Sequence, residues 1–419
     1  MIKTTNRPRL EAVIETTKLE ARPYQVRIVQ RAVNCFLGRD ESKDGRVREA
    51  TQNVLIESPT GSGKTPMGLM SAKYLQEELK SQGEKLTVVW VSMRRNLLKQ
   101  AERENSHPSL ENPDGKGIDL ENLRFISMFC KDLPIDLLPE NREGKLLLIH
   151  DEAQHDTANS AINIHDWFKP DFCLGLTATP FRADRVKLCF SVTINDMGIH
   201  QLIQAGYLSE YNHYTLDEWK PETVAKHYAA DTERWGPSLA FFLTTDECRR
   251  CMEALATEGV PVVANVDIDG HAKEVNCIVT GDSDRERQIL ALERGQFNML
   301  INMAVLTEGF NFPGLKTVWL RDSSKGPTIQ MGGRVFRKFA NISHKQVVQS
   351  GRTEWPMPRT ATPDTSFVWQ PEMMQWLSLK TNPMIDDIED TVRLTALEIE
   401  VEMPDFIINR GKKRRKREG

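Results

Sequence analysis

The sequence is poor in the features that mark secreted, membrane-spanning or disulfide-rich proteins. It has seven cysteines among 419 residues, an odd number scattered along a long chain, which predicts reduced thiols. No apolar run approaches the roughly 20 residues of a membrane helix, and residues 1–7 lack the apolar core of a signal peptide. We therefore expect a cytoplasmic protein that has no membrane partner.

The sequence also lacks a strong excess of either charge. The formal net charge is −4, so any contact with nucleic acid depends on local basic surface rather than on the charge of the whole protein. A hydrophobic content of 39% and a charged content of 27% are typical of globular proteins, and the length predicts two or three domains. The basic run 412–417 either adds non-specific phosphate affinity or is a solvated tail without a partner.

One glycine-containing stretch, residues 57–65, organises the rest of the chain. An apolar run leads into it and apolar residues at helical spacing follow it, which is the strand, loop and helix arrangement of a phosphate-binding loop. Lys64 would supply a positive charge to the outer phosphates, and the Thr65 hydroxyl would ligate Mg²⁺. Ser58 stands where glycine is usual. Alone, the stretch predicts a bound nucleoside triphosphate, with a coincidental turn as the alternative. The other residues of the triphosphate-binding loop are Pro59, Thr60, Gly61, Ser62 and Gly63.

Two adjacent carboxylates, Asp151 and Glu152, follow the strongly apolar run 146–150. Like charges at the end of a buried strand are costly without a cation. Mg²⁺ explains them, because Asp151 would hold the metal while Glu152 polarises a water molecule. The next apolar run, 172–176, also ends in polar residues, at 177–182. Successive strands that end in this way predict an open α/β sheet with its site at the carboxyl ends of the strands.

The second half repeats short apolar runs separated by helical patterns but has no second phosphate loop, which predicts a second α/β domain. Glycines and polar residues within 196–215 mark a boundary. We therefore assign residues 1–206 to a first domain, 207–380 to a second and 381–419 to a C-terminal extension. The predicted strands of the second domain are 239–243, 260–263, 277–279, 299–301 and 318–320.

Arg334 and Arg337 stand three residues apart on a presumed helix, so we expect them to project from one face. Two guanidinium groups with the Gln330 amide nearby suit a triphosphate bound across a domain interface. An isolated arginine pair would be interpreted as surface charge. Because the first domain already supplies a phosphate site, the interface interpretation is favoured.

Other polar residues allow two interpretations each. Gln25 has a planar amide that can pair with the donor and acceptor edge of a purine, with Arg22 or Tyr24 stacking on the base; an ordinary surface amide is the alternative. Arg94 and Arg95, at the end of an apolar run, would either touch a phosphate backbone or remain solvated.

Cys248 and Cys251 form the one CxxC pair of the sequence. Together with Cys277 and His271 they could complete a zinc site. A buried helix face is the favoured interpretation, because no second CxxC pair follows.

Taken in order, these clusters resemble the motifs of superfamily 2 helicases and translocases, especially the branch of restriction-enzyme motor subunits and phage or bacterial DNA helicases. The resemblance covers roughly residues 20–340 and includes six motifs in the expected order. Asn311 stands where the family usually has Asp, and Ser127-Met128 replace its usual Thr-x-Gln, so those two contacts stay unassigned. The matching segments are Arg22-Pro23-Tyr24-Gln25 at the adenine-contacting position, Ser58 to Thr65 (motif I), Val91 to Gln100 (motif Ia), Asp151-Glu152-Ala153-Gln154 (motif II, a DEAQ box), Thr177-Ala178-Thr179-Pro180 (motif III), Thr307 to Pro313 (motif V) and Gln330 to Arg337 (motif VI).

The resemblance implies two tandem RecA-like domains with ATP between them and one nucleic-acid strand crossing both. The implied cofactors are ATP and Mg²⁺. The implied catalytic residues are Lys64, Glu152, Gln330, Arg334 and Arg337, with Thr65 and Asp151 as metal ligands. The residues implied in nucleic-acid contact or coupling are Arg94, Arg95, His155, Thr177, Thr179, Thr307 and Gly309.

The main hypothesis is an ATP-driven helicase or translocase of the bacterial or phage-infected host cytoplasm, acting on DNA rather than RNA. An RNA helicase of the DEAD or DEAH type is an alternative, because the motifs of this family contact phosphates rather than bases and so do not distinguish DNA from RNA. A non-unwinding ATPase motor of a larger complex is another, because no strand-splitting accessory domain is evident between the motifs. The arginine pair argues against an ordinary phosphotransferase with a phosphate-binding loop.

Overall fold

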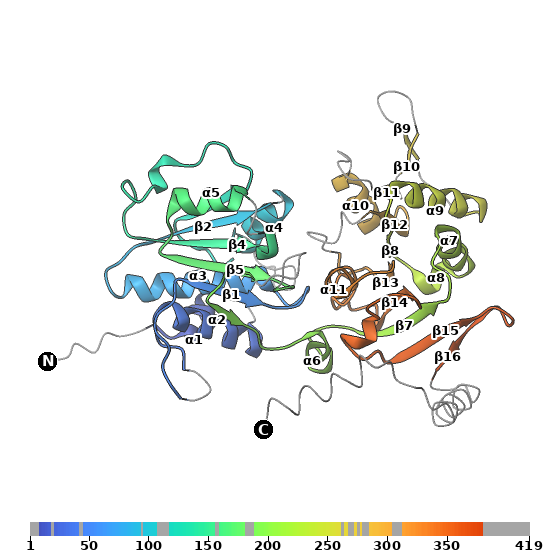
Figure 1. The fold of residues 1–419 in the computed structure, drawn as a ribbon, viewed down its shortest axis with the longest axis horizontal. Helices are drawn as coiled ribbons and strands as arrows, with labels where there is room; N and C mark the ends of the chain where they lie inside the picture. Colours follow the sequence, from blue (N-terminus) through green and yellow to red (C-terminus); the bar gives the residue numbers. More distant parts are fainter. Residues whose placement is uncertain are drawn as a thin grey trace, which may run out of the picture.

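Two α/β units lie side by side in the protein, one from the blue-to-green part of the chain and one from the yellow-to-red part (Figure 1). No helix in the described part of the chain is long and apolar enough to cross a bilayer. The computed structural model describes residues 8–17, 21–41, 45–93, 95–106, 117–155, 159–180, 188–260, 264–266, 272–274, 277–278, 285–303 and 312–379.

The first unit is built on a six-stranded sheet in the order β3-β2-β4-β5-β1-β6, in which every neighbouring pair is parallel. Most of its strands are apolar along nearly their whole length, because helices cover both faces of a parallel sheet. The runs 146–150 and 172–176 and the apolar run that leads into residue 57, which the sequence predicts as strands, are strands in the structure. The strands are β1 (Asn53–Glu57), β2 (Leu86–Ser92), β3 (Leu123–Ser127), β4 (Lys145–Asp151), β5 (Phe172–Thr177) and β6 (Val192–Ile194).

Helices of the first unit pack on opposite faces of this sheet. The helix α3 packs against β2 and β5 on the face that also carries α2 and α4, whereas α5 packs on the other face. Gly68 brings α3 close to the sheet, since a Cβ there would lie 2.7 Å from Leu176 Cδ1. The helical segments are α1 (Leu10–Thr17), α2 (Pro23–Phe36), α3 (Lys64–Lys80), α4 (Arg95–Ser106), η1 (Ile135–Leu137), η2 (Ala153–His155), α5 (Asn159–Phe168) and α6 (Ile199–Gln204).

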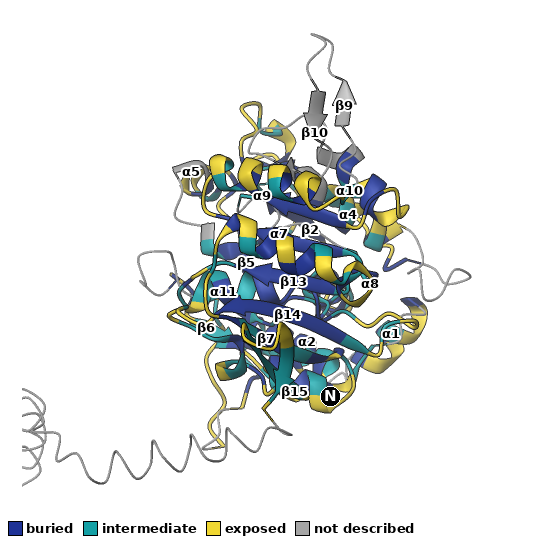
Figure 2. Ribbon diagram, turned by 90° about the vertical axis from the view of Figure 1, so that its right-hand side faces the viewer, coloured by how far each residue is buried: buried dark blue, intermediate teal, exposed yellow. Residues whose placement is uncertain are grey.

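The second unit is built on an eight-stranded sheet in the order β11-β12-β8-β13-β14-β7-β15-β16, parallel except for the final antiparallel hairpin. In Figure 2 its strands β13 and β14 are buried. The strands are β7 (Glu210–Leu216), β8 (Ser238–Phe241), β11 (Cys277–Ile278), β12 (Met299–Asn302), β13 (Thr317–Leu320), β14 (His344–Ser350), β15 (Thr365–Gln370) and β16 (Gln375–Ser378), and a separate pair is β9 (Ala264–Val266) with β10 (Ala272–Glu274). The helical segments are α7 (Pro221–Ala230), α8 (Thr232–Trp235), α9 (Thr245–Thr257), α10 (Arg285–Glu293), α11 (Lys325–Gly332) and η4 (Met357–Arg359).

The central strand β14 does not stand out in the sequence because it contains His344, Lys345 and Gln346 within seven residues. Lys345 is nevertheless fully buried, and its ammonium group donates hydrogen bonds to the carbonyl oxygens of Pro313 at 2.8 Å and Leu315 at 2.5 Å. Burial lowers its pKa to about 8. The carbonyl partners make a buried lysine tolerable in the middle of a sheet.

Two further expectations can be compared with the fold. Cys248 and Cys251 lie on α9 with no exposed surface, inside the apolar core of the second unit, which is the favoured buried-helix interpretation. The other members of the suggested zinc set, His271 and the Cys277 side chain, lie outside the described residues, as does the predicted strand segment 261–263.

Candidate functional site

The phosphate loop joins the end of β1 to the start of α3. Gly61 and Gly63 have φ values of 83° and 85°, a left-handed conformation that glycine adopts without strain. Gly63 is the residue that caps the N-terminus of α3, so Lys64 and Thr65 form the first turn of the helix. The Ser58 hydroxyl donates to Ser62 Oγ at 2.7 Å, and this bond holds the two ends of the loop together. The loop thus presents a helix N-terminus to an anion, as expected for a phosphate site.

Two residues of α2 donate hydrogen bonds to the backbone of this loop. The Tyr24 hydroxyl donates to the Ser62 carbonyl oxygen at 2.6 Å, and Gln25 Nε2 donates to the same oxygen at 2.8 Å. Tyr24 is buried, with its ring 5.3 Å from that of Tyr207, and the guanidinium of Arg22 lies 5.2 Å from the centre of the Tyr207 ring. The segment expected to contact adenine therefore supports the loop in this structure, and its aromatic neighbour Tyr207 lies outside the motifs.

The carboxylates at the end of β4 face the lysine of the loop. Burial, then the neighbouring charge of Glu152, raises the pKa of Asp151, while Lys64 acts in the opposite direction. Burial lowers the pKa of Lys64, against the attraction of Glu152 and Asp151. Glu152 has a φ of 57°, which is uncommon for a residue other than glycine and is typical of strained functional positions. Acidic and basic groups thus share a buried site at the carboxyl ends of β1 and β4.

A chain of hydrogen bonds runs from Glu152 toward the second unit. Gln154 Nε2 donates to Glu152 Oε2 at 3.0 Å, and the Thr177 hydroxyl donates to Gln154 Oε1 at 2.7 Å. The Thr179 backbone N–H in turn donates to the Thr177 hydroxyl oxygen at 3.0 Å. Finally, Gln330 Nε2 contacts Thr179 Oγ1 at 3.4 Å, from α11 of the other unit. The DEAQ glutamine therefore connects the carboxylate to motif III and, through it, to motif VI.

The two arginines of motif VI also reach the loop, but the expectation that they lie on a helix is wrong. The helix α11 ends at Gly332, and both arginines follow it in the irregular segment 333–337, which begins as a turn. A Cβ on Gly333 would lie 2.9 Å from Thr60 Cβ, and one on Gly61 would lie 3.4 Å from Arg337 Cγ. The glycine at the end of α11 thus allows the segment to turn onto the phosphate loop.

Burial in this interface lowers the pKa of Arg337 to about 10, and the positive charge of Arg334 acts in the same direction. A third carboxylate, Glu104, opposes that shift. Glu104 lies on α4, where Gln100 Nε2 donates to its Oε1 at 2.8 Å, and burial raises its pKa. No motif signals Glu104, since α4 is a polar helix in the sequence and only the packing of the two units brings Glu104 near Arg337.

These features fit a magnesium nucleoside triphosphate. The first unit supplies an open glycine loop at a helix N-terminus, which suits phosphate oxygens. Burial, together with the negative charge of Glu152, raises the pKa of Asp151, so a divalent cation beside this carboxylate would be stabilised. Thr65 and Asp151 offer a hydroxyl and a carboxylate, the oxygen donors that Mg²⁺ prefers.

Several residues singled out in the sequence lie outside the described part of the chain. Arg94, Thr307 and Gly309 are among them, and nothing is described of the side chains of Arg95 and His155. Their expected contacts with nucleic acid stay predictions.

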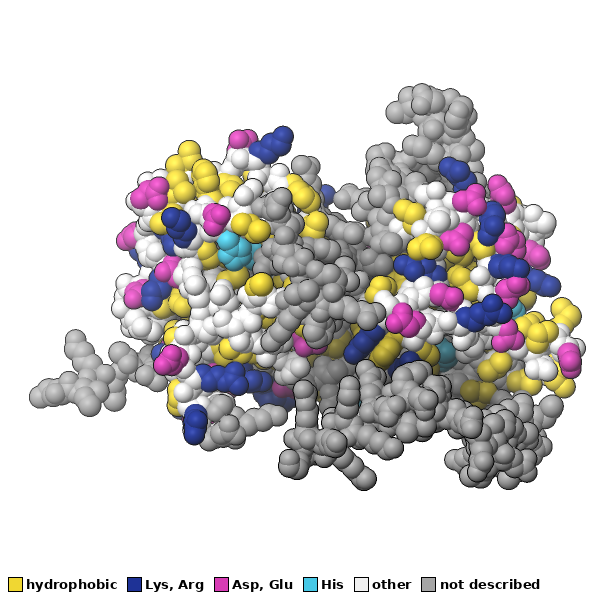
Figure 3. All heavy atoms as spheres, viewed as in Figure 1, with side chains coloured by type: hydrophobic (Ala, Val, Ile, Leu, Met, Phe, Trp, Pro, Cys, Tyr) yellow, Lys and Arg dark blue, Asp and Glu magenta, His cyan; other side chains and the backbone are white. Residues whose placement is uncertain are grey.

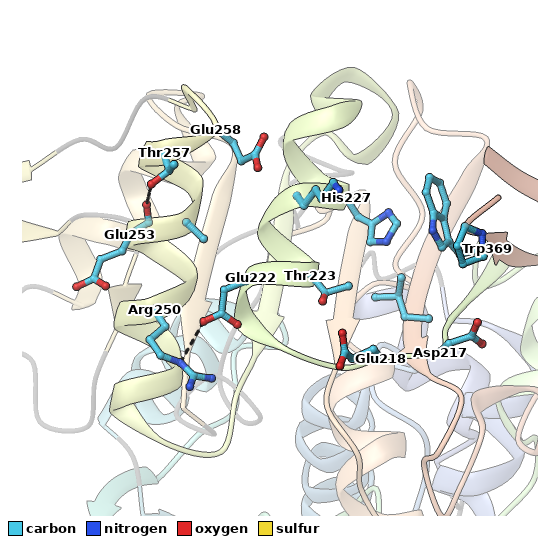
Figure 4. A pocket seen from close by; sticks show the side chains of 14 residues that line it. Asp217, Glu218, Glu222, Thr223, His227, Arg250, Glu253, Thr257, Glu258 and Trp369 are labelled. Carbon is cyan, nitrogen blue, oxygen red and sulfur yellow. Dashed lines mark hydrogen bonds and ion pairs between the residues drawn. The ribbon is translucent and has the colours of Figure 1, made fainter. Parts of the chain in front are cut away.

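A hollow of about 740 Å³ lies on the second unit, apart from this site (Figure 4). Arg250 of α9 pairs with Glu222 of α7 at 3.4 Å, and His227 meets Trp369 with ring centres 4.3 Å apart. None of the described motif residues lines this hollow. Acidic and basic side chains also interleave over the face of the second unit seen in Figure 3. The interface between the units is therefore the better candidate for the functional site.

Residues 18–182 match the family model described as "Type III restriction enzyme, res subunit". That segment contains the phosphate loop, the DEAQ box and motif III.

Two yeast proteins are similar over most of the chain. "Putative mitochondrial ATP-dependent helicase irc3" of Schizosaccharomyces pombe is 24% identical over 338 residues, which cover 71% of this chain and 51% of that protein. "Putative ATP-dependent helicase IRC3" of Saccharomyces cerevisiae is 23% identical over 369 residues, covering 77% of this chain and 53% of that protein. The chain spans about half the length of these curated relatives.

Among solved structures, the fold is similar to that of "ATP-dependent Type ISP restriction-modification enzyme LlaBIII bound to DNA". The TM-score is 0.51 at 13% identity, with 79% of this chain and 27% of that chain covered. This similarity concerns the fold, and it confirms the expected tandem RecA-like α/β architecture.

Proposed function

Because the chain has the motif order and the fold of superfamily 2 helicases and translocases, we propose that it is an ATP-dependent nucleic-acid helicase or translocase. The observation that carries this proposal is the position of motif VI. Gly333 and Arg337 of the second unit lie against Thr60 and Gly61 of the phosphate loop. A triphosphate in that loop would therefore be enclosed by both units.

In the proposed mechanism the first unit holds ATP. The loop N–H groups and Lys64 bind the β- and γ-phosphates. Gln25 and Arg22 would contact the adenine. Mg²⁺, held by Thr65 and Asp151, would neutralise charge on the phosphate oxygens. Glu152 orients or deprotonates the attacking water, and Gln154 keeps that carboxylate in place by its hydrogen bond.

The second unit supplies the charge that the reaction needs. As the γ-phosphoryl group leaves, Arg334 and Arg337 neutralise the negative charge that develops on its oxygens, which typically accelerates hydrolysis by about 10³ to 10⁵. Gln330 contacts Thr179 of the first unit. Through this contact, a conformational change in the first unit would be transmitted to the second. Since these groups come from different units, hydrolysis and product release would change how the units close on each other.

We propose single-stranded or duplex DNA as the track, in a bacterial or phage-infected host cytoplasm. The solved structure with a similar fold is bound to DNA, and residues 18–182 match a restriction-enzyme subunit family; both observations support DNA over RNA. Contacts mainly to phosphates would make binding tolerant of sequence and dependent on salt. We also propose a division near residue 206, which is supported by the path of the chain from β6 through α6 into β7.

The test is the ATPase rate of the purified protein with single-stranded DNA, duplex DNA, branched DNA and RNA. We expect stimulation by DNA, abolished turnover in Lys64→Ala with the circular dichroism spectrum intact, and at least about 10³-fold slower hydrolysis in Arg337→Ala. Arg359→Ala is the matched control, because Arg359 stacks on Trp355 at the surface of the same unit. Unchanged turnover in Lys64→Ala would refute the ATPase assignment.

A strand-displacement assay then separates the two motor types. Displacement of a labelled strand that depends on ATP identifies a helicase, whereas DNA-stimulated hydrolysis without displacement identifies a translocase or a motor subunit. Stimulation by RNA alone would contradict DNA as the track.

A further inference from the structure

Three side chains with metal-binding atoms meet inside the first unit, away from the phosphate loop. They are His150 on β4, His165 on α5 and Cys173 on β5, and one ligand atom of each lies within 4.8 Å of the other two. His165 Nε2 and Cys173 Sγ are 3.9 Å apart, and the two imidazole rings are nearly parallel with centres 4.8 Å apart. His150 and Cys173 are buried at 0% and 1% exposure.

This cluster lies on the face of the sheet that α5 covers. Side chains alternate along a strand, so His150 points to the same face as Leu146 and Leu148, which pack against α5. The neighbouring Asp151 therefore points away from His150 and toward the ATP site. The three residues take no part in the proposed ATP chemistry, and none of the motifs accounts for their grouping.

Their chemistry matches a borderline-soft metal ion. Zn²⁺ binds imidazole nitrogen at about 2.0–2.1 Å and thiolate sulfur at about 2.3 Å, so its ligand atoms are roughly 3.3–3.8 Å apart in a tetrahedral site. The ligand atoms of the three residues lie within 4.8 Å of one another. Each distance would therefore have to shorten by no more than about 1.5 Å to reach the tetrahedral range. Histidine χ2 torsions are soft, so both rings can turn their nitrogens toward a common point.

We propose that His150, His165 and Cys173 form a binding site for one Zn²⁺ ion. On binding, the Cys173 thiol releases its proton to solvent, and the thiolate and two neutral imidazoles donate lone pairs to the metal. A water molecule or backbone oxygen completes the tetrahedron, as in other sites with three protein ligands.

The ion would tie β4 and β5 to α5. β4 ends at Asp151, next to Glu152, and β5 ends at Thr177, whose hydroxyl donates a hydrogen bond to Gln154 Oε1. A metal behind these strands would hold the ends that carry motifs II and III in register. Its role would be structural, because none of its ligands faces the phosphate loop.

The first experiment measures the metal content of the purified full chain by mass spectrometry, after dialysis against Zn²⁺ and then against metal-free buffer. We expect stoichiometric zinc in the parent protein and its loss in His165→Ala and Cys173→Ser. Cys35→Ala is the matched control, since Cys35 is another buried thiol of the first unit, and it should keep its zinc. Equal zinc in the parent and in Cys173→Ser would overturn the proposal.

The second experiment needs no variant, so a folding defect cannot obscure it. The parent protein is titrated with Co²⁺, and a tetrahedral site containing a thiolate produces visible d–d bands together with a sulfur-to-cobalt charge-transfer band in the near ultraviolet. We expect both bands, reversal by Zn²⁺ and a rise of several degrees in Tm on Zn²⁺ addition, as metal binding to the folded state requires. Absence of the charge-transfer band would refute a site that includes Cys173. Preference for another ion over Zn²⁺ would refute the zinc assignment.

Discussion

Replacing Gln154 with Leu removes the side chain that joins Glu152 to Thr177. Leu has a similar volume but neither donates nor accepts a hydrogen bond. The Gln154 amide donates to Glu152 Oε2 at 3.0 Å and accepts from the Thr177 hydroxyl at 2.7 Å. The substitution therefore frees the proposed water-activating carboxylate while leaving the phosphate loop untouched.

The size of the effect follows from the charge on Glu152. A hydrogen bond to a charged group is worth about 1.5–3 kcal/mol, and each 1.36 kcal/mol of barrier changes a rate by about tenfold. If the bond positions Glu152 in the transition state, kcat should fall roughly 10- to 100-fold while the KM for ATP changes little. The neutral bond to Thr177 contributes about 1 kcal/mol to stability instead.

The assay is steady-state ATP hydrolysis with saturating DNA, together with nucleotide binding measured by fluorescence. Gln82→Leu is the matched control, because Gln82 is exposed just beyond the end of α3 and its side-chain amide donates to the Glu78 carbonyl oxygen. If kcat of folded Gln154→Leu stays within about twofold of the parent, the hydrogen bond does not position Glu152 for catalysis.

Three other predictions follow from individual contacts. Gly63→Ala should lose nucleotide binding in a fluorescence titration, because its Cβ would lie 2.5 Å from Gln25 Nε2. Gly83 has a similar positive φ but open space around it, so Gly83→Ala should bind nucleotide normally. Lys345→Met should lower the free energy of unfolding by about 1–3 kcal/mol, since two buried carbonyl oxygens lose their donor; a urea midpoint equal to that of the parent would contradict this. His213 has its pKa lowered to about 4 by burial, so the unfolded chain takes up a proton first and the stability contribution present above pH 6.5 is lost as the pH falls toward 4. Urea unfolding between pH 7 and 4 should show that decline, and His213→Asn should reduce its slope.

The residue pattern alone identified much of the site, because its chemistry is local. Lys64 and Thr65 follow glycines that open a helix, and Asp151 ends an apolar run, so their placement at the ends of parallel strands follows from secondary structure. Gln330 and the two arginines stand at short, fixed spacing in the sequence, and the family resemblance assigns the same three residues to the ATP site. These features required no knowledge of which strands are neighbours.

Other features depend on residues that are far apart in the sequence. The helix that was expected to contain Arg334 and Arg337 ends at Gly332. The chain then turns toward Thr60 of the phosphate loop. The polar strand β14 is central in its sheet because distant carbonyl oxygens accept from Lys345. Local propensity predicts neither outcome, since tertiary contacts override it.

The residue pattern predicts the chemical groups of the ATP site, which are a phosphate loop, two carboxylates and a pair of arginines. The fold is needed to see that Gln154 holds Glu152, that Glu104 lies near Arg337, and that His150, His165 and Cys173 lie close together. These contacts join residues that are distant in the sequence, so they depend on strand order. The order β3-β2-β4-β5-β1-β6 brings β5 between β4 and β1, and no local pattern of residues encodes that arrangement.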